Sequence, residues 1–266
     1  MRATMPPVFL ATLITLLLPL SASAQSTTPA QTSTPVPQAI PATGNTVEAA
    51  PQLEPFVASY LVYRDGKPLG EATMQLVRQQ PPRWRVDLVM QGTRGLMGLA
   101  GLNAEQSSVF DQIGETYRPL TQATVNKLLF KRKQTIGIYD WASGSANWQG
   151  DVKESHRRPI ALQAGDMTGL LINLAVIRDA APGQTLHYRF VDDGRMRQHT
   201  YVVADELESI TVAGMTYKAM KATRSKDNED TLIWVVKNVP SPIRMLKREN
   251  GKDVYDLRLV EYKGVE

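Results

Sequence analysis

Residues 83–90 of this chain read RWRVDLVM, and their alternation indicates the fold. The apolar side chains of Trp84, Val86, Leu88 and Met90 are two residues apart, so in an extended strand they share one face. The charged side chains between them share the other face. A strand of this kind is typical of an antiparallel sheet that packs on a core with one face and meets water with the other.

The same alternation recurs along the chain between tight turns. Further alternating segments lie at residues 56–62, 186–190 and 255–259. Dipeptides that tolerate positive φ stand beside them, namely Asp65-Gly66, Asp193-Gly194 and Asn250-Gly251. Short strands joined by tight turns predict an antiparallel meander.

One segment breaks this alternation. Residues 166–179 read DMTGLLINLAVIRD, and their apolar side chains follow a helical spacing at Leu170, Leu171, Leu174 and Ile177. Asp166 is the expected N-cap, because an Asp that opens a helix accepts backbone N–H groups. So wide an apolar surface must be covered. We therefore predict a mainly β fold, a curled antiparallel sheet or half-barrel wrapped around one apolar helix at about 166–179.

The N-terminal segment has the features of an export signal. Residues 9–20 read FLATLITLLLPL, behind a start that contains Arg2 and before Ala22-Ser23-Ala24. An apolar run of this length is too short to span a bilayer, and the small residues after it form a cleavage site. We expect residues 1–24 to be a signal peptide, cleaved after Ala24, and the protein to work outside the cytoplasm without being an integral membrane protein.

A tether and one domain follow. Residues 25–55 are rich in Pro, Thr and Ser and lack an apolar period, so we expect a disordered tether, either a spacer that holds the domain away from a membrane or a plain leader. The chain has 30 Lys and Arg against 26 Asp and Glu, and all but Arg2, Glu48 and Glu54 lie in residues 56–266, a single domain of net charge +5. The absence of Cys excludes disulfides and thiolate nucleophiles.

Four segments together carry a family resemblance. They are Tyr60–Gly70, Gln163–Leu171, Glu208–Gly214 and Leu232–Trp234 with Pro240–Arg244. In this order they resemble the bacterial exported family catalogued as domain of unknown function 3108, over about residues 56–262, with Thr168 where the family usually has Ser. The resemblance implies a secreted or periplasmic β-rich protein with no assigned chemistry. It also suggests a likeness to the curled half-barrels of periplasmic lipoprotein-sorting chaperones and to spiral-like β proteins of the envelope.

The sequence offers little that favours catalysis. His187 and His199 are expected nearly opposite one another across the Asp193-Gly194 turn, on the charged side of their strands, but a third metal ligand is not evident. Asp166 with Thr168 is better explained as a cap than as an acid and a hydroxyl nucleophile. The acidic residues 227–230 lack the spacing of a calcium loop. We expect no catalytic residues, no metal and no cofactor, and a protein that is not an enzyme.

Two groups of apolar residues are candidates for ligand contact. Inside the curled sheet the candidates are Trp84, Leu88, Leu170, Leu174, Tyr188 and Trp234. The glycine-rich stretch at residues 92–102 adds Leu96, Met97 and Leu99. This stretch is either a lid over a hydrophobic cavity, a segment that dips into a membrane surface, or a loop that plugs the open end of the sheet.

A cluster of cations is the candidate for surface contact. Lys127, Lys131, Arg132 and Lys133 surround the apolar residues 128–130. Outside the cytoplasm such a cluster meets anionic phospholipid or anionic polymers, and it lacks the interleaved aromatic residues that stack nucleic-acid bases. The alternative is a solvated strand face that favours solubility.

Two functions follow from these expectations. The first is a non-enzymatic binding or carrier module for an apolar or lipid-like envelope component. The second is a structural scaffold of the envelope, with a filled core, that docks a protein or an anionic polymer. The volume enclosed between the helix and the sheet distinguishes them, since a carrier needs an apolar cavity of several hundred Å³.

Overall fold

The computed structural model of the chain describes residues 53–93, 103–212 and 214–264. The expected signal peptide and nearly all of the expected tether lie outside these residues. So do Leu96, Met97 and Leu99, which leaves the choice between lid and plug as a prediction.

The described residues form strands, one α-helix and one short 3-10 helix, η1 (Glu154–His156). The helix is α2 (Gly169–Asp179). The strands are β1 (Phe56–Arg64), β2 (Lys67–Arg78), β3 (Arg83–Gly92), β4 (Asn103–Ile113), β5 (Thr116–Leu128), β6 (Lys131–Asp140), β7 (Ser145–Gly150), β8 (Ile160–Ala161), β9 (Asp166–Met167), β10 (Thr185–Asp192), β11 (Arg195–Val203), β12 (Glu208–Val212), β13 (Met215–Lys226), β14 (Glu229–Val235), β15 (Arg244–Glu249) and β16 (Lys252–Gly264).

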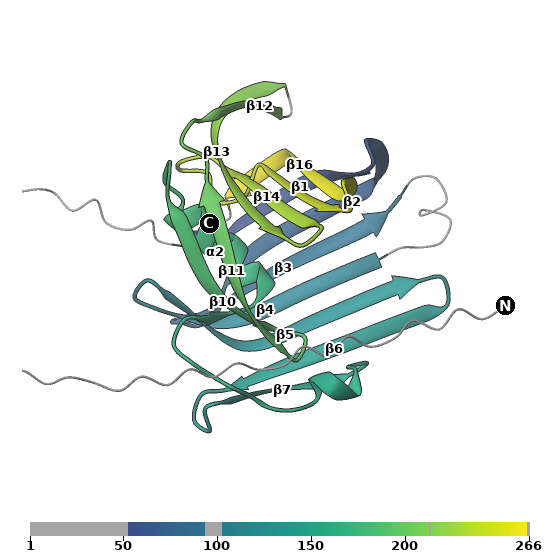
Figure 1. Cartoon of the computed structure of the whole chain (residues 1–266), viewed down its shortest axis with the longest axis vertical. Coiled ribbons are helices and arrows are strands. Elements are labelled where there is room, and N and C mark those ends of the chain that lie inside the picture. Colours follow the sequence, from purple (N-terminus) through teal and green to yellow (C-terminus); the bar gives the residue numbers. More distant parts are fainter. Residues whose placement is uncertain (1–52, 94–102, 213, 265–266) are drawn as a thin grey trace, which may run out of the picture. The chain divides into compact units, whose positions relative to one another are not determined.

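All of these strands belong to one large unclosed sheet. Its order is β8-β7-β6-β5-β4-β3-β2-β1-β16-β15-β14-β13-β11-β10-β9, with β12 paired to β13 off this path. Neighbours pair antiparallel except β9 and β10, which run parallel. The first and last strands, β1 and β16, are adjacent in the middle of the sheet. The sheet curls around α2, as Figure 1 shows, and this confirms the predicted mainly β fold wrapped around one helix.

The alternation that predicts the strands also sets their faces. In β3 the side chains of Trp84 and Val86 are buried and those of Arg83 and Arg85 are exposed. Asp87 is the exception on the outer face, since it is buried beneath Arg85 and Gln75, both of which donate hydrogen bonds to its carboxylate. Period-two burial therefore turns one face of the sheet toward the core.

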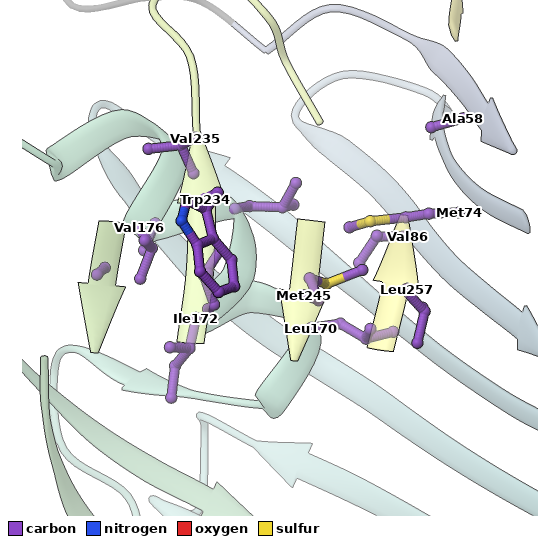
Figure 2. Close-up of a cluster of buried hydrophobic side chains, with 14 of the residues drawn as sticks. Ala58, Met74, Val86, Leu170, Ile172, Val176, Trp234, Val235, Met245 and Leu257 are labelled. Atoms are coloured by element: carbon purple, nitrogen blue, oxygen red, sulfur yellow. The ribbon is translucent and has the colours of Figure 1, made fainter. Parts of the chain in front are cut away.

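The helix α2 lies on this inner face. Six of its side chains are buried, those of Leu170, Leu171, Ile172, Leu174, Ala175 and Val176. Figure 2 shows Leu170, Ile172 and Val176 among residues of the C-terminal strands such as Trp234 and Leu257. Each large buried apolar side chain contributes about 1.5–3 kcal/mol, so packing against the sheet accounts for the helix.

The predicted N-cap is wrong. Thr168, not Asp166, caps α2, and the Thr168 side chain accepts a hydrogen bond from the N–H of Leu171. Asp166 lies before the cap in β9, where it is fully buried and forms an ion pair with Arg189 of β10. Because β9 pairs with β10, Asp166 adopts an extended conformation and the helix begins after it.

A second, smaller hydrophobic cluster lies beside β6 and β7. It consists of Tyr139, Ala146, Trp148, Val152 and Val191. The Tyr139 hydroxyl donates a hydrogen bond of 2.6 Å to the carbonyl of Val191, which ties β6 to β10 across the curl of the sheet. Over the described ranges, no helix has the length and apolarity needed to cross a membrane.

Candidate functional site

A cavity of about 330 Å³ lies inside the curled sheet, beside α2. Its walls come from α2 and from the inner faces of β3, β4, β10, β11 and β13 to β16. This volume is within the range of small-molecule sites in proteins. The interior is therefore not completely filled by side chains of the described residues.

The strand register arranges one wall of the cavity in two rows. Arg224, Thr231, Lys247 and Tyr255 stand opposite one another across β13, β14, β15 and β16 and form a polar row. Two residues further along the same strands, a second row contains Ile233, Met245 and Leu257. The cavity is thus polar at one level and apolar at the next.

The opposite wall is mostly apolar. Ile172 and Asn173 of α2 line it together with Leu88 and Met90 of β3 and Ala104 of β4. Met90 pairs with Ala104 across the two strands, so both project from the same face. An apolar chain placed between this wall and the apolar row would be enclosed on both sides.

The charged side chains around the cavity are mainly cationic. Arg195, Arg197, Arg224 and Lys247 line it, against the carboxylates of Asp192 and Glu229. Arg195 forms an ion pair of 2.8 Å with Asp193, and Lys247 pairs with Glu249 and, at 3.8 Å, with Glu229. Within the described part of the chain, neither Arg197 nor Arg224 has a carboxylate oxygen within 4 Å. The site therefore has uncompensated positive charge.

His199 faces the cavity from β11. Its side chain is 8% exposed, and its ring stacks on Phe190 with 4.5 Å between the ring centroids. The Nδ1 atom is buried and has no hydrogen-bond partner among the described residues. Burial, and then the charges of Arg224, Arg197 and Lys226, lower the pKa of His199 to about 4, so the ring is neutral at pH 7.

His187 and His199 are nearly opposite, as predicted, but the expectation that both lie on the charged side of their strands is wrong. The Asp193-Gly194 turn pairs His199 with Tyr188, and His187 with Thr200. Since adjacent residues of a strand point to opposite faces, His187 is exposed on the outside while His199 faces the interior. In the described ranges, no three His, Asp or Glu side chains are grouped in a way that could hold a metal ion.

Asp192 lies where β10 meets the first turn of α2. Its carboxylate accepts hydrogen bonds from the N–H groups of Asp193 at 2.7 Å and Gly169 at 3.4 Å. Gly169 is the first residue of α2, so Asp192 places negative charge at the positive end of the helix dipole. Burial nevertheless raises the pKa of Asp192 to about 6, more than these hydrogen bonds lower it.

The candidate contact residues from the sequence divide into two sets. Leu88 lines the cavity. Trp84, Leu170, Leu174, Tyr188 and Trp234 are buried in the main hydrophobic cluster and do not line it. Sequence reasoning missed the cations that line the cavity, Arg195, Arg197, Arg224 and Lys247. Alternation in β11 puts Arg195 and Arg197 on the face of buried Tyr201, and this was the available signal.

The four cations of the candidate surface cluster surround the β5–β6 turn. Lys127 pairs with Arg132 on one face of the hairpin, while Lys131 and Lys133 project from the other. All four are exposed. Leu129 and Phe130 at the tip are 59% and 103% exposed. The cluster is therefore not one strand face but a ring of cations around an exposed apolar tip.

Comparisons with known proteins agree with this fold. The model of a family described as protein of unknown function (DUF3108) matches residues 59–258. No curated protein matches the chain. A crystal structure described as a beta-barrel-like protein of domain of unknown function DUF1849 from Brucella abortus is similar with a TM-score of 0.50 and 11% identity, over 81% of this chain and 99% of that one. At this identity the likeness concerns the fold alone.

Proposed function

The chain belongs to the DUF3108 family of proteins of unknown function, and from this premise and its cavity we propose that it is a non-enzymatic binding or carrier module for an apolar or lipid-like component of the cell envelope. The location in this proposal rests on the sequence. Residues 9–20 and the small residues that follow favour export to the periplasm, where such components are available.

The observation that carries the proposal is the cavity of about 330 Å³ between α2 and the sheet. A scaffold with a filled core needs no such space, whereas a ligand site does. Ile172, Leu88 and Leu257 line it with apolar surface that an acyl chain would cover. Burial of that chain would contribute about 25 cal/mol for each Å² of apolar area.

The test fills the cavity with a side chain. Ala104 lines the cavity, whereas its neighbour Glu105 is exposed on the outer face of β4. We expect the purified wild-type chain to carry lipid in native mass spectrometry and to bind a fluorescent fatty-acid probe. Ala104→Trp should lose both properties, and Glu105→Trp should keep them.

Circular dichroism and thermal melts establish that each variant is folded. Gln106→Trp, which fills the same cavity two residues along β4, replaces Ala104→Trp if that variant unfolds. The proposal is overturned if the wild-type chain carries no lipid and binds no probe, or if a folded cavity-filling variant binds the probe as wild type does.

A second candidate function is surface docking, which the β5–β6 hairpin favours. Phe130 is fully exposed at its tip, and Lys127, Lys131, Arg132 and Lys133 surround it. Exposed apolar side chains need an apolar acceptor, and the four cations need an anionic one. An anionic phospholipid surface supplies both, whereas an anionic polymer supplies only the charge.

Vesicle flotation tests this docking. The chain should bind vesicles that contain phosphatidylglycerol and not vesicles of phosphatidylcholine alone, since each surface cation contributes about 1 kcal/mol near an anionic membrane. Phe130→Ser should weaken binding, while Ile113→Ser, at the β4–β5 turn and 51% exposed, should not. Equal loss in the two variants, or equal binding to both vesicles, would exclude hairpin docking.

A further inference from the structure

The polar row of the cavity contains a charged side chain, Arg224, that is hydrogen-bonded to Thr231 and Tyr201 but has one N–H group without an acceptor among the described residues. Arg224 on β13 donates through Nη2 to the hydroxyl of Thr231 at 3.3 Å. Its Nε atom is buried and has no hydrogen-bond partner in the described structure. Leaving a buried donor unsatisfied costs about 1–3 kcal/mol, and more for a charged group. Such a donor, inside a cavity, needs an acceptor from outside the protein.

A second side chain with an unsatisfied nitrogen, His199, lines the same cavity. Tyr201 of β11 lies beside Arg224, because Val202 pairs with Thr223 on the neighbouring strand. His199, two residues from Tyr201, faces the same cavity with a buried Nδ1 that has no partner among the described residues. Arg224 lines this cavity too, from the strand next to that of His199. Arg224 and His199, each with one buried nitrogen that has no partner among the described residues, therefore line the same cavity from adjacent strands.

Among the described residues, the carboxylates that line the cavity do not pair with Arg224 or Arg197. Asp192 accepts N–H groups at the start of α2, and Glu229 lies 3.8 Å from Lys247. Arg197 adds a further cation without a carboxylate within 4 Å in the described residues. A cationic ligand head would be repelled here, and a neutral head would leave Arg224 without a charge-matched acceptor.

We infer that the cavity takes an amphiphile with an anionic oxyanion head, a carboxylate or a phosphate, and that Arg224 and His199 bind this head from adjacent strands. The apolar chain of this ligand lies between the row of Ile233, Met245 and Leu257 and the wall of α2 and β3. This inference rests on the proposed binding function and specifies its ligand class. Neutral His199 suits the role, since one ring nitrogen carries a proton to donate.

A series of dodecyl compounds tests the ligand class. Isothermal titration of the purified chain is performed with dodecanoate, dodecyl phosphate, dodecanol and dodecylammonium, which share the chain and differ in the head. We expect the two anions to bind about tenfold or more tightly than the alcohol, which corresponds to a charge-assisted hydrogen bond in a partly buried site. The ratio between carboxylate and phosphate then identifies the head.

Matched variants test the residues. Arg224→Gln should weaken binding of the anions about tenfold and leave binding of dodecanol within about twofold. Arg158→Gln is the control, because Arg158 is exposed and lies outside the cavity. His199→Gln should weaken the anions less than Arg224→Gln does, because the amide still donates a hydrogen bond.

The His199 ring supplies a second readout. In an NMR titration, dodecanoate should raise the pKa of His199 from about 4, because the bound anion offsets the neighbouring cations. The inference is overturned if dodecanol or dodecylammonium binds as tightly as dodecanoate, or if Arg224→Gln weakens all four alike. Absence of binding by all four compounds overturns the proposed function itself, and the inference with it.

Discussion

Thr168 connects the helix to the sheet through a single hydroxyl. Its Oγ1 accepts a hydrogen bond from the N–H of Leu171 at 3.3 Å and lies 2.8 Å from the hydroxyl oxygen of Ser108 on β4. Both side chains are fully buried. Without this hydroxyl, α2 loses its cap and Ser108 its partner.

Thr168→Ala should therefore lower the free energy of unfolding by about 2–3 kcal/mol, the sum of a lost cap and an unsatisfied buried hydroxyl. Urea denaturation measures this loss. Thr168→Ser keeps the hydroxyl and should cost about 1 kcal/mol or less, from the lost methyl group. If alanine and serine are equally destabilising, the hydroxyl is not what stabilises the start of the helix.

His199 and Asp192 face the same cavity and respond to pH in opposite directions. The pKa of His199 is lowered to about 4, so between pH 6.5 and pH 4 the unfolded chain takes up a proton that the folded chain does not, and stability falls as the pH falls. The pKa of Asp192 is raised to about 6, so in nearly the same window the folded chain takes up the proton and stability rises as the pH falls. In the wild-type chain the two effects offset one another.

Single variants should separate these effects. Relative to wild type, His199→Gln should become more stable by about 2 kcal/mol between pH 7 and pH 4.5, while Asp192→Asn should become less stable by a similar or smaller amount. Denaturation at both pH values measures the two differences. If the stability of either variant changes with pH as that of wild type does, the corresponding group does not titrate as its surroundings imply.

At the scale of elements, the β10–β11 turn supports the segment around η1. Gly194 has a φ of +64°, and a Cβ atom at this position would lie 2.0 Å from the carbonyl oxygen of His156. Gly114 in the β4–β5 turn has a similar φ of +59° but open space around it. The two glycines therefore share the backbone requirement and differ only in the contact.

Gly114→Ala should cost about 1–2 kcal/mol, from the left-handed backbone conformation alone. Gly194→Ala should cost clearly more, because His156 must also move. Proteolysis should detect that movement as faster cleavage near residues 154–158 in Gly194→Ala only. If the two variants lose the same stability and are cleaved alike, the packing of the 3-10 segment on this turn does not contribute to the stability of the fold.

Some of the elements could be predicted from the sequence, whereas the register between neighbouring strands could not. The alternation in residues 83–90 correctly predicts β3, and the helical spacing of Leu170, Leu171 and Leu174 correctly predicts α2. The direction of His199 depends on the register that the Asp193-Gly194 turn imposes, and a shift of one residue reverses the face. The cap at Thr168 depends on β9 pairing with β10, a contact over 23 residues that no local pattern contains.

At the scale of the whole domain, pairing between β1 and β16 determines the form of the sheet. Tyr63 of the first strand pairs with Asp256 of the last, a contact that spans most of the chain. It joins the N-terminal meander to the C-terminal one, so that β3 and β4 face β13 to β15 across the helix. The cavity forms between strands that are distant in sequence, which is why no contiguous motif reveals it.

The same pairing places the β5–β6 hairpin and the polar row of the cavity at one end of the sheet. The β1–β2, β13–β14 and β15–β16 turns share an end, because Tyr63 pairs with Asp256 and Glu229 with Glu249. The β5–β6 turn lies at this end too, since Gly70 pairs with Gly92 and Asn103 with Lys127. Figure 1 shows the arrowheads of β3 and β5 at that end. The polar row at Arg224 is nearer to it than the apolar row.

This arrangement predicts that docking accelerates ligand transfer without changing affinity. With a fluorescent fatty acid held in phosphatidylglycerol vesicles, Phe130→Ser should slow transfer to the protein several-fold, because Phe130 lies outside the cavity and acts only on the encounter with the membrane. The dissociation constant for the free probe should equal that of wild type. Ala104→Trp should lose both transfer and binding, since it fills the cavity itself. If Phe130→Ser changes the affinity, or leaves the transfer rate unchanged, then docking by the hairpin does not precede ligand uptake by the cavity.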